Sequence, residues 1–167
     1  MGFMTRRRAF HMLRRGRNLK GLFKLIKPYI KEKDPDALYI YACISLPEWG
    51  ETEHSFFERR YKYLRFAARA GNIEAIYEIG LVLHTGHGGI EQDKRKAAEH
   101  FKMAAEKGHP MSKLYYGLDL FYGSCGIQKD EVLGISFVHQ AVDDGVPDAR
   151  YTLNKLLKLR EIEQTSQ

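Results

Sequence analysis

The sequence predicts an all-α fold, a right-handed α-solenoid of stacked antiparallel helix pairs. The main observation is an internal repeat, because residues 80–93 recur at 117–130, an offset of 37 residues with no gap. A third, partial copy follows at 141–153. Self-similarity at a period of 20 to 50 residues is typical of arrays in which each unit packs on its neighbours. Each copy is therefore expected to be a helical hairpin.

Charge is distributed unevenly along the 167 residues, whose formal net charge is +6. Residues 1–33 contain eleven Lys and Arg and one acid, a formal charge of +10, and the remaining residues sum to −4. The apolar content of 44% is that of a soluble globular domain. No apolar run is long enough for a bilayer span, and residues 9–13 are too short for a signal peptide core. The expected location is the cytoplasm.

Two cysteines, Cys43 and Cys125, lie about two repeats apart. Because each repeat of a solenoid contacts only its neighbours, they are not expected to pair. Their use favours a reducing compartment.

The N-terminal elements follow from turn and cap residues. Residues 1–5 are expected to be a loose end, followed by a helix over 6–15 that Gly16 ends. The next helix spans 19–31, where Pro28 should kink it or end it near Lys27. Asp34 should cap a helix that runs to about residue 46, and another spans about 52–69.

The repeated half is expected to form helices over about 73–84, 93–107, 110–122, 129–143 and 147–160. Gly71, Gly108 and Gly145 follow helix ends, where a left-handed conformation suits glycine. Gly80 and Gly117 lie inside helices, where glycine costs about 1 kcal/mol. We expect them to admit a neighbouring helix, with small residues facing them: Ala67, Ala104 and Ala141.

The predicted organisation has a basic helical cap, a solenoid and a tail. The cap is 1–33, the solenoid is 34–162 and the polar tail is 163–167. The solenoid divides into units of about 34–70, 71–107 and 108–144, with a C-terminal capping helix over 145–162.

The first full copy resembles a known family. The run is Ala75-x-Tyr77-x-Ile79-Gly80-x6-Gly86-x-Gly88-Gly89-Ile90-x2-Asp93-x3-Ala97-x3-Phe101-x2-Ala104-Ala105-x2-Gly108. It resembles the SEL-one-like repeat, a relative of the tetratricopeptide repeat, over about 67–153 and more weakly from 34. The second copy departs at Gly134, where the family favours alanine, and at Val138, where it favours an aromatic residue.

The resemblance implies a non-catalytic scaffold or adaptor that binds another protein or peptide. Family members take part in the assembly of complexes, in signalling and in bacterial interactions with hosts or competitors. A bacterial immunity or regulatory protein is compatible with this class.

The expected partner site is on the first helix of each pair, the A helix, which lines the concave surface of such solenoids. With Ala75, Ile79 and Leu83 turned to the core, a step of about 100° per residue defines the opposite side. The candidate residues there are Glu74, Glu78, Thr85, Met111, Tyr115, Asp119 and Tyr122. The alternative is that Tyr115 and Tyr122 pack between repeats.

A basic patch is the second candidate. Its residues are Arg6, Arg7, Arg8, Arg14, Arg15, Arg17, Lys20, Lys24 and Lys27. It can bind nucleic acid, lie on an anionic membrane, or form the charged outer side of a structural cap. Terminal repeats need atypical caps, which favours the last.

No catalytic residue, metal or cofactor is predicted. His84 and His87 straddle a helix end, and no cysteine or carboxylate completes a ligand set. The glycines at 86–89 lack the lysine of a phosphate-binding loop, and no nucleophile elbow occurs. The sequence therefore predicts that the protein is not an enzyme.

Overall fold

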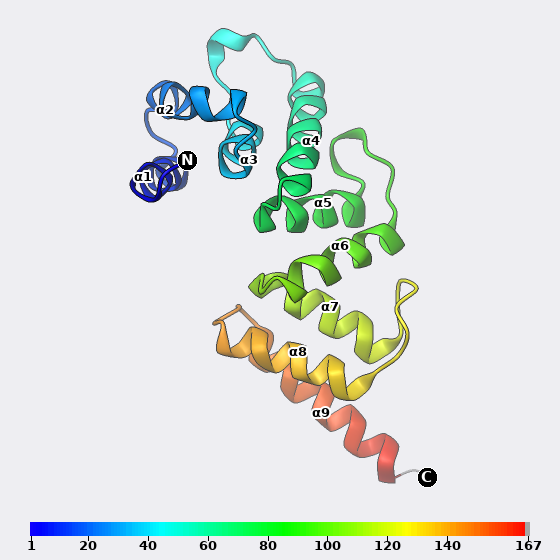
Figure 1. Ribbon diagram of the computed structural model, residues 1–167. Helices are drawn as coiled ribbons and strands as arrows, with labels where there is room; N and C mark the ends of the chain where they lie inside the picture. The colour runs from blue at the N-terminus through cyan, green and yellow to red at the C-terminus, as the bar shows by residue number, and fades with distance from the viewer. Residues whose placement is uncertain (166–167) are drawn as a thin grey trace. The chain divides into compact units, whose positions relative to one another are not determined.

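The computed structural model describes residues 1–165, and that range contains only helices and turns (Figure 1). The all-α prediction is confirmed for these residues. The helices in order are α1 (Phe3–Arg15), α2 (Leu19–Lys31), α3 (Pro35–Cys43), η1 (Pro47–Trp49), α4 (Glu53–Arg69), α5 (Ile73–Thr85), η2 (His87–Gly89), α6 (Lys94–Glu106), α7 (Pro110–Tyr122), α8 (Glu131–Asp143) and α9 (Ala149–Thr165).

The chain forms two compact units, residues 1–91 and the residues from Gln92 on. The first contains α1 to α5 with η1 and η2, and the second contains α6 to α9. The boundary lies between α5 and α6, inside the segment 71–107 that the sequence period assigns to one repeat. The division by period stays a prediction.

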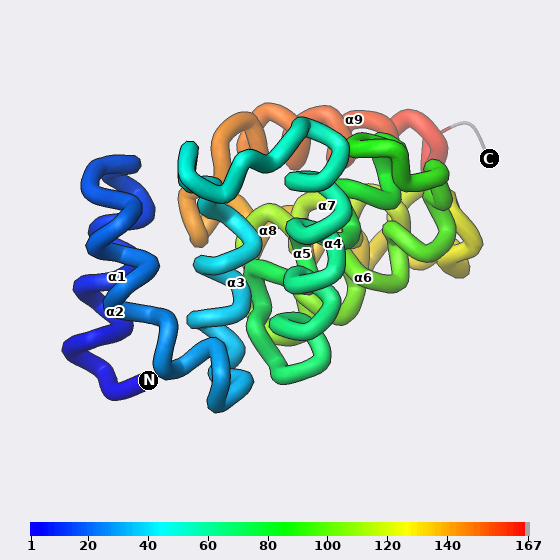
Figure 2. The backbone as a smooth tube through the Cα atoms, turned by 90° about the horizontal axis from the view of Figure 1, so that it is seen from above, coloured from blue at the N-terminus to red at the C-terminus, as the bar shows by residue number. Residues whose placement is uncertain are grey.

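In the first unit, α1 and α2 lie side by side next to α3 (Figures 1 and 2). Ala9 and Leu22 from the hairpin, with Ile40 and Leu64 from α3 and α4, are fully buried. The side chain of Asp34 accepts the N–H groups of Asp36 and Ala37 at 3.1 and 3.0 Å, as predicted for the cap of α3. The apolar sides of the basic segment are therefore part of this core.

One expectation for the N-terminal helices is wrong, and one of the two alternatives for Pro28 is excluded. α1 begins at Phe3 because extended Gly2 provides its N-cap and accepts the N–H of Arg6 at 2.9 Å, so residues 3–5 are helical. α2 continues to Lys31 instead of ending near Lys27. Pro28 cannot donate a hydrogen bond, but buried Ile26 precedes it and half-buried Tyr29 follows. Burial of this apolar side holds the last turn in place.

The second unit packs α6 to α9 in succession (Figure 1). α7 and α8 approach each other closely at two glycines, Gly117 and Gly134. A Cβ on Gly117 would lie 2.8 Å from the carbonyl oxygen of Gly134 and 2.8 Å from Val138 Cγ2. The predicted close approach at Gly117 is present, but the facing residue is Gly134 and not Ala141. Ala141 instead packs with Val146 and Ala149 at the start of α9.

The chain reverses direction at glycines that recur with the repeat. Gly71, Gly108 and Gly145 have φ angles of +94°, +91° and +75°, the left-handed conformation predicted for them. At the other end, α9 extends to Thr165, so the tail predicted for 163–167 is helical over 163–165. Residues 166 and 167 lie outside the described residues.

Candidate interaction surfaces

The candidate residues of α5 share one side of that helix. A step of about 100° per residue places Glu74, Glu78 and Thr85 within roughly 40° of one another. The opposite side carries Ile79 and Leu83, which are 3% and 6% exposed. Glu74 and Thr85 are exposed, and the hydroxyl of Thr85 donates to the carbonyl of Leu81 at 2.9 Å.

Glu78 is held by the preceding helix. Its carboxylate pairs with Arg60 of α4 at 2.6 Å, and only a quarter of its side chain is exposed. Burial, with the nearby Cys43, Glu78 and Glu74, raises the pKa of Tyr39 on α3. Burial also raises the pKa of the Cys43 thiol, which lies 3.9 Å from Arg60. The Tyr39 phenol and the Cys43 thiol are therefore neutral groups with two acidic side chains nearby, Glu74 and Glu78.

Three of the four candidates on α7, Tyr115, Asp119 and Tyr122, lie on the side of the helix opposite Gly117. The α8 side is marked by Gly117 and by Tyr116, whose ring contacts Phe137 edge-on at 5.0 Å. Tyr122 is 51% exposed, and its ring contacts that of neighbouring Phe121 edge-on at 5.1 Å. Asp119 is half-buried and accepts the hydroxyl of Ser124. Tyr122 therefore offers the largest open apolar surface of the set.

Tyr115 and Met111 are involved in packing. The ring of Tyr115 stacks on Phe101 of α6, with centroids 4.6 Å apart and planes 14° from parallel. Met111 packs against the cluster of Ala141, Val146 and Ala149. For Tyr115, packing between helices of successive repeats is the arrangement found, whereas Tyr122 remains open.

Repeat-equivalent positions in the two units play equivalent parts. Glu78 and Tyr115 are 37 residues apart, and each contacts the helix that precedes its own. Thr85 and Tyr122 are also 37 residues apart, and both are exposed at the end of their helix. The sequence period thus matches packing and exposure at these two pairs of positions but not at Glu74 and Met111, where the first is exposed and the second packs.

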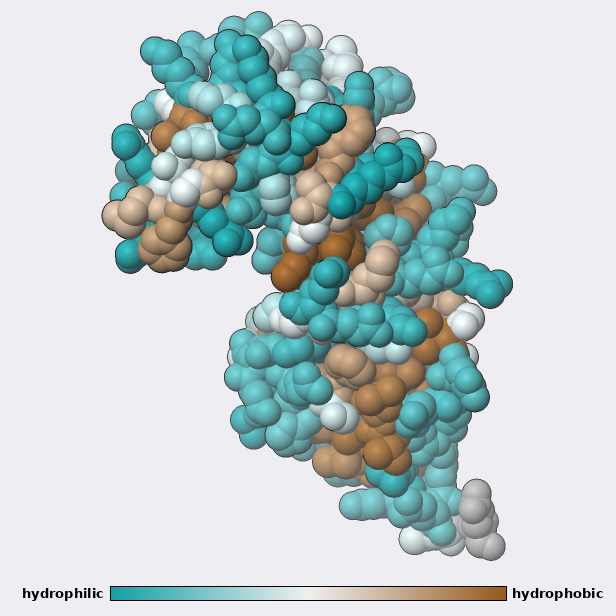
Figure 3. All heavy atoms as spheres, in the orientation of Figure 1, coloured by the Kyte–Doolittle hydropathy of each residue, from teal (hydrophilic) through white to brown (hydrophobic). Residues whose placement is uncertain are grey.

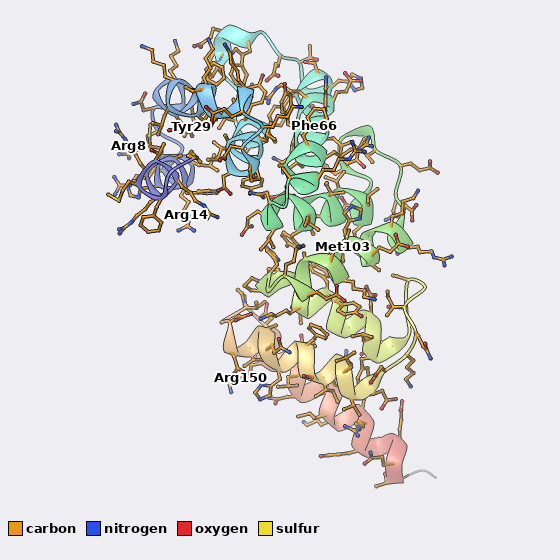
Figure 4. The ribbon with its side chains drawn as sticks, viewed as in Figure 1. Arg8, Arg14, Tyr29, Phe66, Met103 and Arg150 are labelled. Carbon is orange, nitrogen blue, oxygen red and sulfur yellow. The ribbon has the colours of Figure 1, made fainter. Side chains whose placement is uncertain are left out.

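All nine residues of the basic patch are exposed. Arg6 pairs with Asp36 at 2.8 Å and Lys20 with Glu48 at 3.2 Å. Lys27 lies 5.9 Å from the ring of Phe23. Among the described residues no acid pairs with the other six: Arg7, Arg8, Arg14, Arg15, Arg17 and Lys24. Figure 4 shows Arg8 and Arg14 extending outward from α1.

Sequence reasoning missed the cluster around Arg59. Its guanidinium pairs with Glu51, donates to the carbonyls of Tyr41 and Ile44 at 2.7 Å each, and lies 5.0 Å from the Trp49 ring. The hydrogen bond from Arg59 lowers the pKa of Glu51. Two of these partners, Tyr41 and Ile44, lie 18 and 15 positions from Arg59, so no local sequence spacing predicts the cluster.

A second missed feature is a polar chain through α1, α3 and α5. Asp36 accepts from Arg6 and, at 2.9 Å, from the amide of Asn72. Asn72 is 6% exposed and also caps α5 by accepting the N–H of Ala75. An asparagine directly before a predicted helix is a usable signal for a cap, but not for the contact with Asp36.

The glycine-rich turn after α5 forms no phosphate cradle. A Cβ on Gly88 would lie 2.8 Å from the Phe57 ring, and His87 contacts the same ring edge-on at 4.7 Å. The adjoining hollow is mainly apolar, with Leu64 and Val82 in its lining. Across residues 1–165 no three or more His, Cys, Asp or Glu side chains gather as metal ligands, and no helix is long and apolar enough to cross a membrane.

Paired helices at a constant period, with positive-φ glycines between pairs, define the class of α-solenoid repeat proteins. The family model for the Sel1 repeat matches residues 73–109 and 110–146. Residues 73–146 therefore consist of two Sel1 repeats, which confirms the resemblance stated from the sequence.

Solved structures share this fold. A Sel1 repeat protein from Oxalobacter formigenes superposes with a TM-score of 0.68 at 23% identity, covering 78% of this chain and 95% of that one. The protein c5321, a protective antigen of uropathogenic Escherichia coli with an SLR fold, gives a TM-score of 0.60 at 20% identity. That match covers 76% of this chain and 26% of c5321.

Curated relatives are similar over part of the chain. The yeast chitin synthase regulator SKT5 is 32% identical over 57% of this chain, and mouse cytochrome c oxidase assembly factor 7 is 33% identical over 46%. The Arabidopsis ERAD-associated E3 ubiquitin-protein ligase component HRD3A is 36% identical over 38%. The matches span 13%, 32% and 9% of these relatives' own lengths.

Proposed function

We propose that this chain is a non-catalytic adaptor of the cytoplasm that binds a partner protein or peptide through the exposed sides of its A helices, α5 and α7. The observation that carries the proposal is the exposure of Thr85 and Tyr122, which occupy the same position in successive repeats. Tyrosine is enriched among residues that dominate binding energy at interfaces. Glu74 adds an exposed acid on the same side of α5, which suits a partner with basic groups.

The relatives' names support this class of role. They describe a regulator of an enzyme, an assembly factor and a component of a ligase, and each term refers to action on or within another protein assembly. An immunity protein or other regulator would act in the same way. The partner itself is a matter for experiment, because these matches cover a minor part of each relative.

Capture of partners from a lysate, read by mass spectrometry, tests the proposed face. Tyr122→Ala should reduce capture of the specific partner about tenfold or more, the effect of losing an interface anchor. Tyr151→Ala on α9 is the matched control, because Tyr151 is 74% exposed and equally open to substitution. Both variants should keep the melting temperature of the parent chain, since neither ring is buried.

Tyr115 is unsuitable for this test because its stacking on Phe101 would confound binding with stability. If capture survives Tyr122→Ala combined with Glu74→Ala, the partner binds elsewhere. The non-catalytic part of the proposal is tested separately by elemental analysis and absorption spectroscopy. A stoichiometric metal or chromophore in the purified chain would contradict it.

A further inference from the structure

The solvent side of α1 combines cations with exposed apolar side chains. Helical geometry places Arg7, Arg14, Arg8 and Arg15 on the side opposite Ala9, which is fully buried. Phe3 and Met4 lie on this same side and are 75% and 73% exposed. Over α1 the surface is largely hydrophilic and encloses a small hydrophobic area (Figure 3). These apolar side chains therefore contribute little to the core of the unit.

α2 extends the positive charge. Its lysines form one stripe opposite the buried Leu22 and Ile26. They are Lys20, Lys24, Lys27 and Lys31, all exposed. Arg17, also exposed, lies in the turn that joins the two helices. We refer to the outward cations of α1, α2 and this turn as the cationic surface.

Few acids oppose this charge. Asp36 binds Arg6 on the α3 side, and Asp34 caps α3. Glu48 neutralises Lys20 alone, and Glu32 is the one acid within residues 1–33. The cationic surface therefore retains most of its charge and exerts a positive field on its surroundings.

We propose that the cationic surface binds the surface of an anionic lipid bilayer, with Phe3 and Met4 entering the boundary between headgroups and acyl chains. Anionic leaflets attract clustered Lys and Arg, and interfacial helices place apolar side chains at that depth. No residue of this surface belongs to α5 or α7, the helices of the proposed partner site.

Duplex nucleic acid would account for the cations but not for the exposed apolar pair. The α1–α2 hairpin has one amide side chain, that of Asn18, whose Oδ1 accepts the N–H of Gly21 as the cap of α2. Phosphate contacts alone would give a purely salt-dependent, sequence-independent interaction. Binding to an anionic bilayer should therefore depend on Phe3 and Met4, whereas binding to duplex nucleic acid should not.

Flotation of the full chain with vesicles tests the proposal. Vesicles of phosphatidylcholine with about 30% phosphatidylserine should bind the chain, and vesicles of phosphatidylcholine alone should not. Replacing Arg7, Arg8, Arg14 and Arg15 by glutamine should weaken binding at least tenfold, since each cation near an anionic leaflet contributes about fivefold. Glutamine retains helix propensity, and circular dichroism should be unchanged.

A matched control removes the same charge elsewhere. Lys102, Lys107, Lys155 and Lys158 are exposed on or beside helices of the second unit. Replacing them by glutamine should change vesicle binding by less than about threefold, because they lie outside the cationic surface. An equal loss from both quadruple variants would show that net charge alone drives binding and would overturn the proposal.

Insertion has its own readout. A Phe3→Trp variant should show a blue shift in tryptophan emission with anionic vesicles beyond any change from Trp49 in the parent chain. Phe3→Ala with Met4→Ala should weaken vesicle binding severalfold while leaving binding to duplex DNA unchanged. Absence of vesicle binding at low salt, absence of the shift, or preferential binding to DNA would each overturn the proposal.

Discussion

The contact between α7 and α8 predicts that Gly134→Ala destabilises the protein. A Cβ at this position would lie 2.7 Å from the carbonyl oxygen of Gly117 and 2.8 Å from the backbone nitrogen of Phe121. Both atoms belong to backbone, so no rotamer change relieves the overlap, and α8 must move from α7 by roughly 0.7 Å. Overpacking of this kind costs about 1–3 kcal/mol, and the upper part of that range applies here.

Alanine also recovers about 1 kcal/mol of helix propensity, which leaves a net loss of about 1–2 kcal/mol. For a chain of this length the melting temperature should fall by about 2–8 °C. The assay is thermal and urea unfolding followed by far-ultraviolet circular dichroism. Exposed Ser136 on the same helix supplies the control. The difference in stability between Ser136→Ala and Ser136→Gly measures the helix propensity of alanine over glycine without the contact between α7 and α8. If Gly134→Ala stabilises the chain by the propensity difference, the close approach is not what selects glycine.

Three further predictions concern the first unit. Arg59→Ala should lower the unfolding free energy by about 3–5 kcal/mol, since it leaves Glu51 and two backbone carbonyls without their partner. Urea unfolding measures this loss, and a loss below about 1 kcal/mol would refute the prediction. Because Arg59 depresses the pKa of Glu51 in the folded state, this pair stabilises fully above about pH 4.5 and progressively less below it. Glu51→Gln should thus flatten the loss of stability on acidification, and an unchanged pH profile would contradict the assignment. Asn72→Ala should cost about 1–2 kcal/mol through loss of the cap, and Asn72→Ser should cost less, because serine also caps helices; equal thermal stability of the two variants would argue against capping.

The sequence predicts the elements well because their determinants are local. Asp34 before a proline and the glycines past helix ends act within a few residues of a helix end, and the 37-residue period repeats such signals. The helices begin and end within about two residues of expectation over most of the repeats. Pro28 shows where local rules are insufficient. They allow the helix to end near Lys27, whereas burial of the surrounding apolar side chains keeps it helical to Lys31.

The candidate surface was predictable in part. Periodicity places Glu74, Thr85 and Tyr122 on open sides of their helices, as the structure has them. It does not reveal that Tyr115 stacks on Phe101, because that contact depends on how α6 lies against α7. Gly134 is similar: its departure from the family pattern is visible in the sequence, but its reason is the backbone of the facing helix.

The two contacts at equivalent positions, Arg60 with Glu78 and Phe101 with Tyr115, both bridge the second helix of one hairpin and the first helix of the next. A duplication of one hairpin, with the bounds that the 37-residue period gives, would copy one residue of such a contact without its partner. The segment that can be transplanted intact is therefore out of phase with the apparent repeat, from α4 through α5 or from α6 through α7. Chimeras cut between α5 and α6 keep both contacts, whereas cuts at Gly71 or Gly108 would join an arginine to a tyrosine or a phenylalanine to a glutamate.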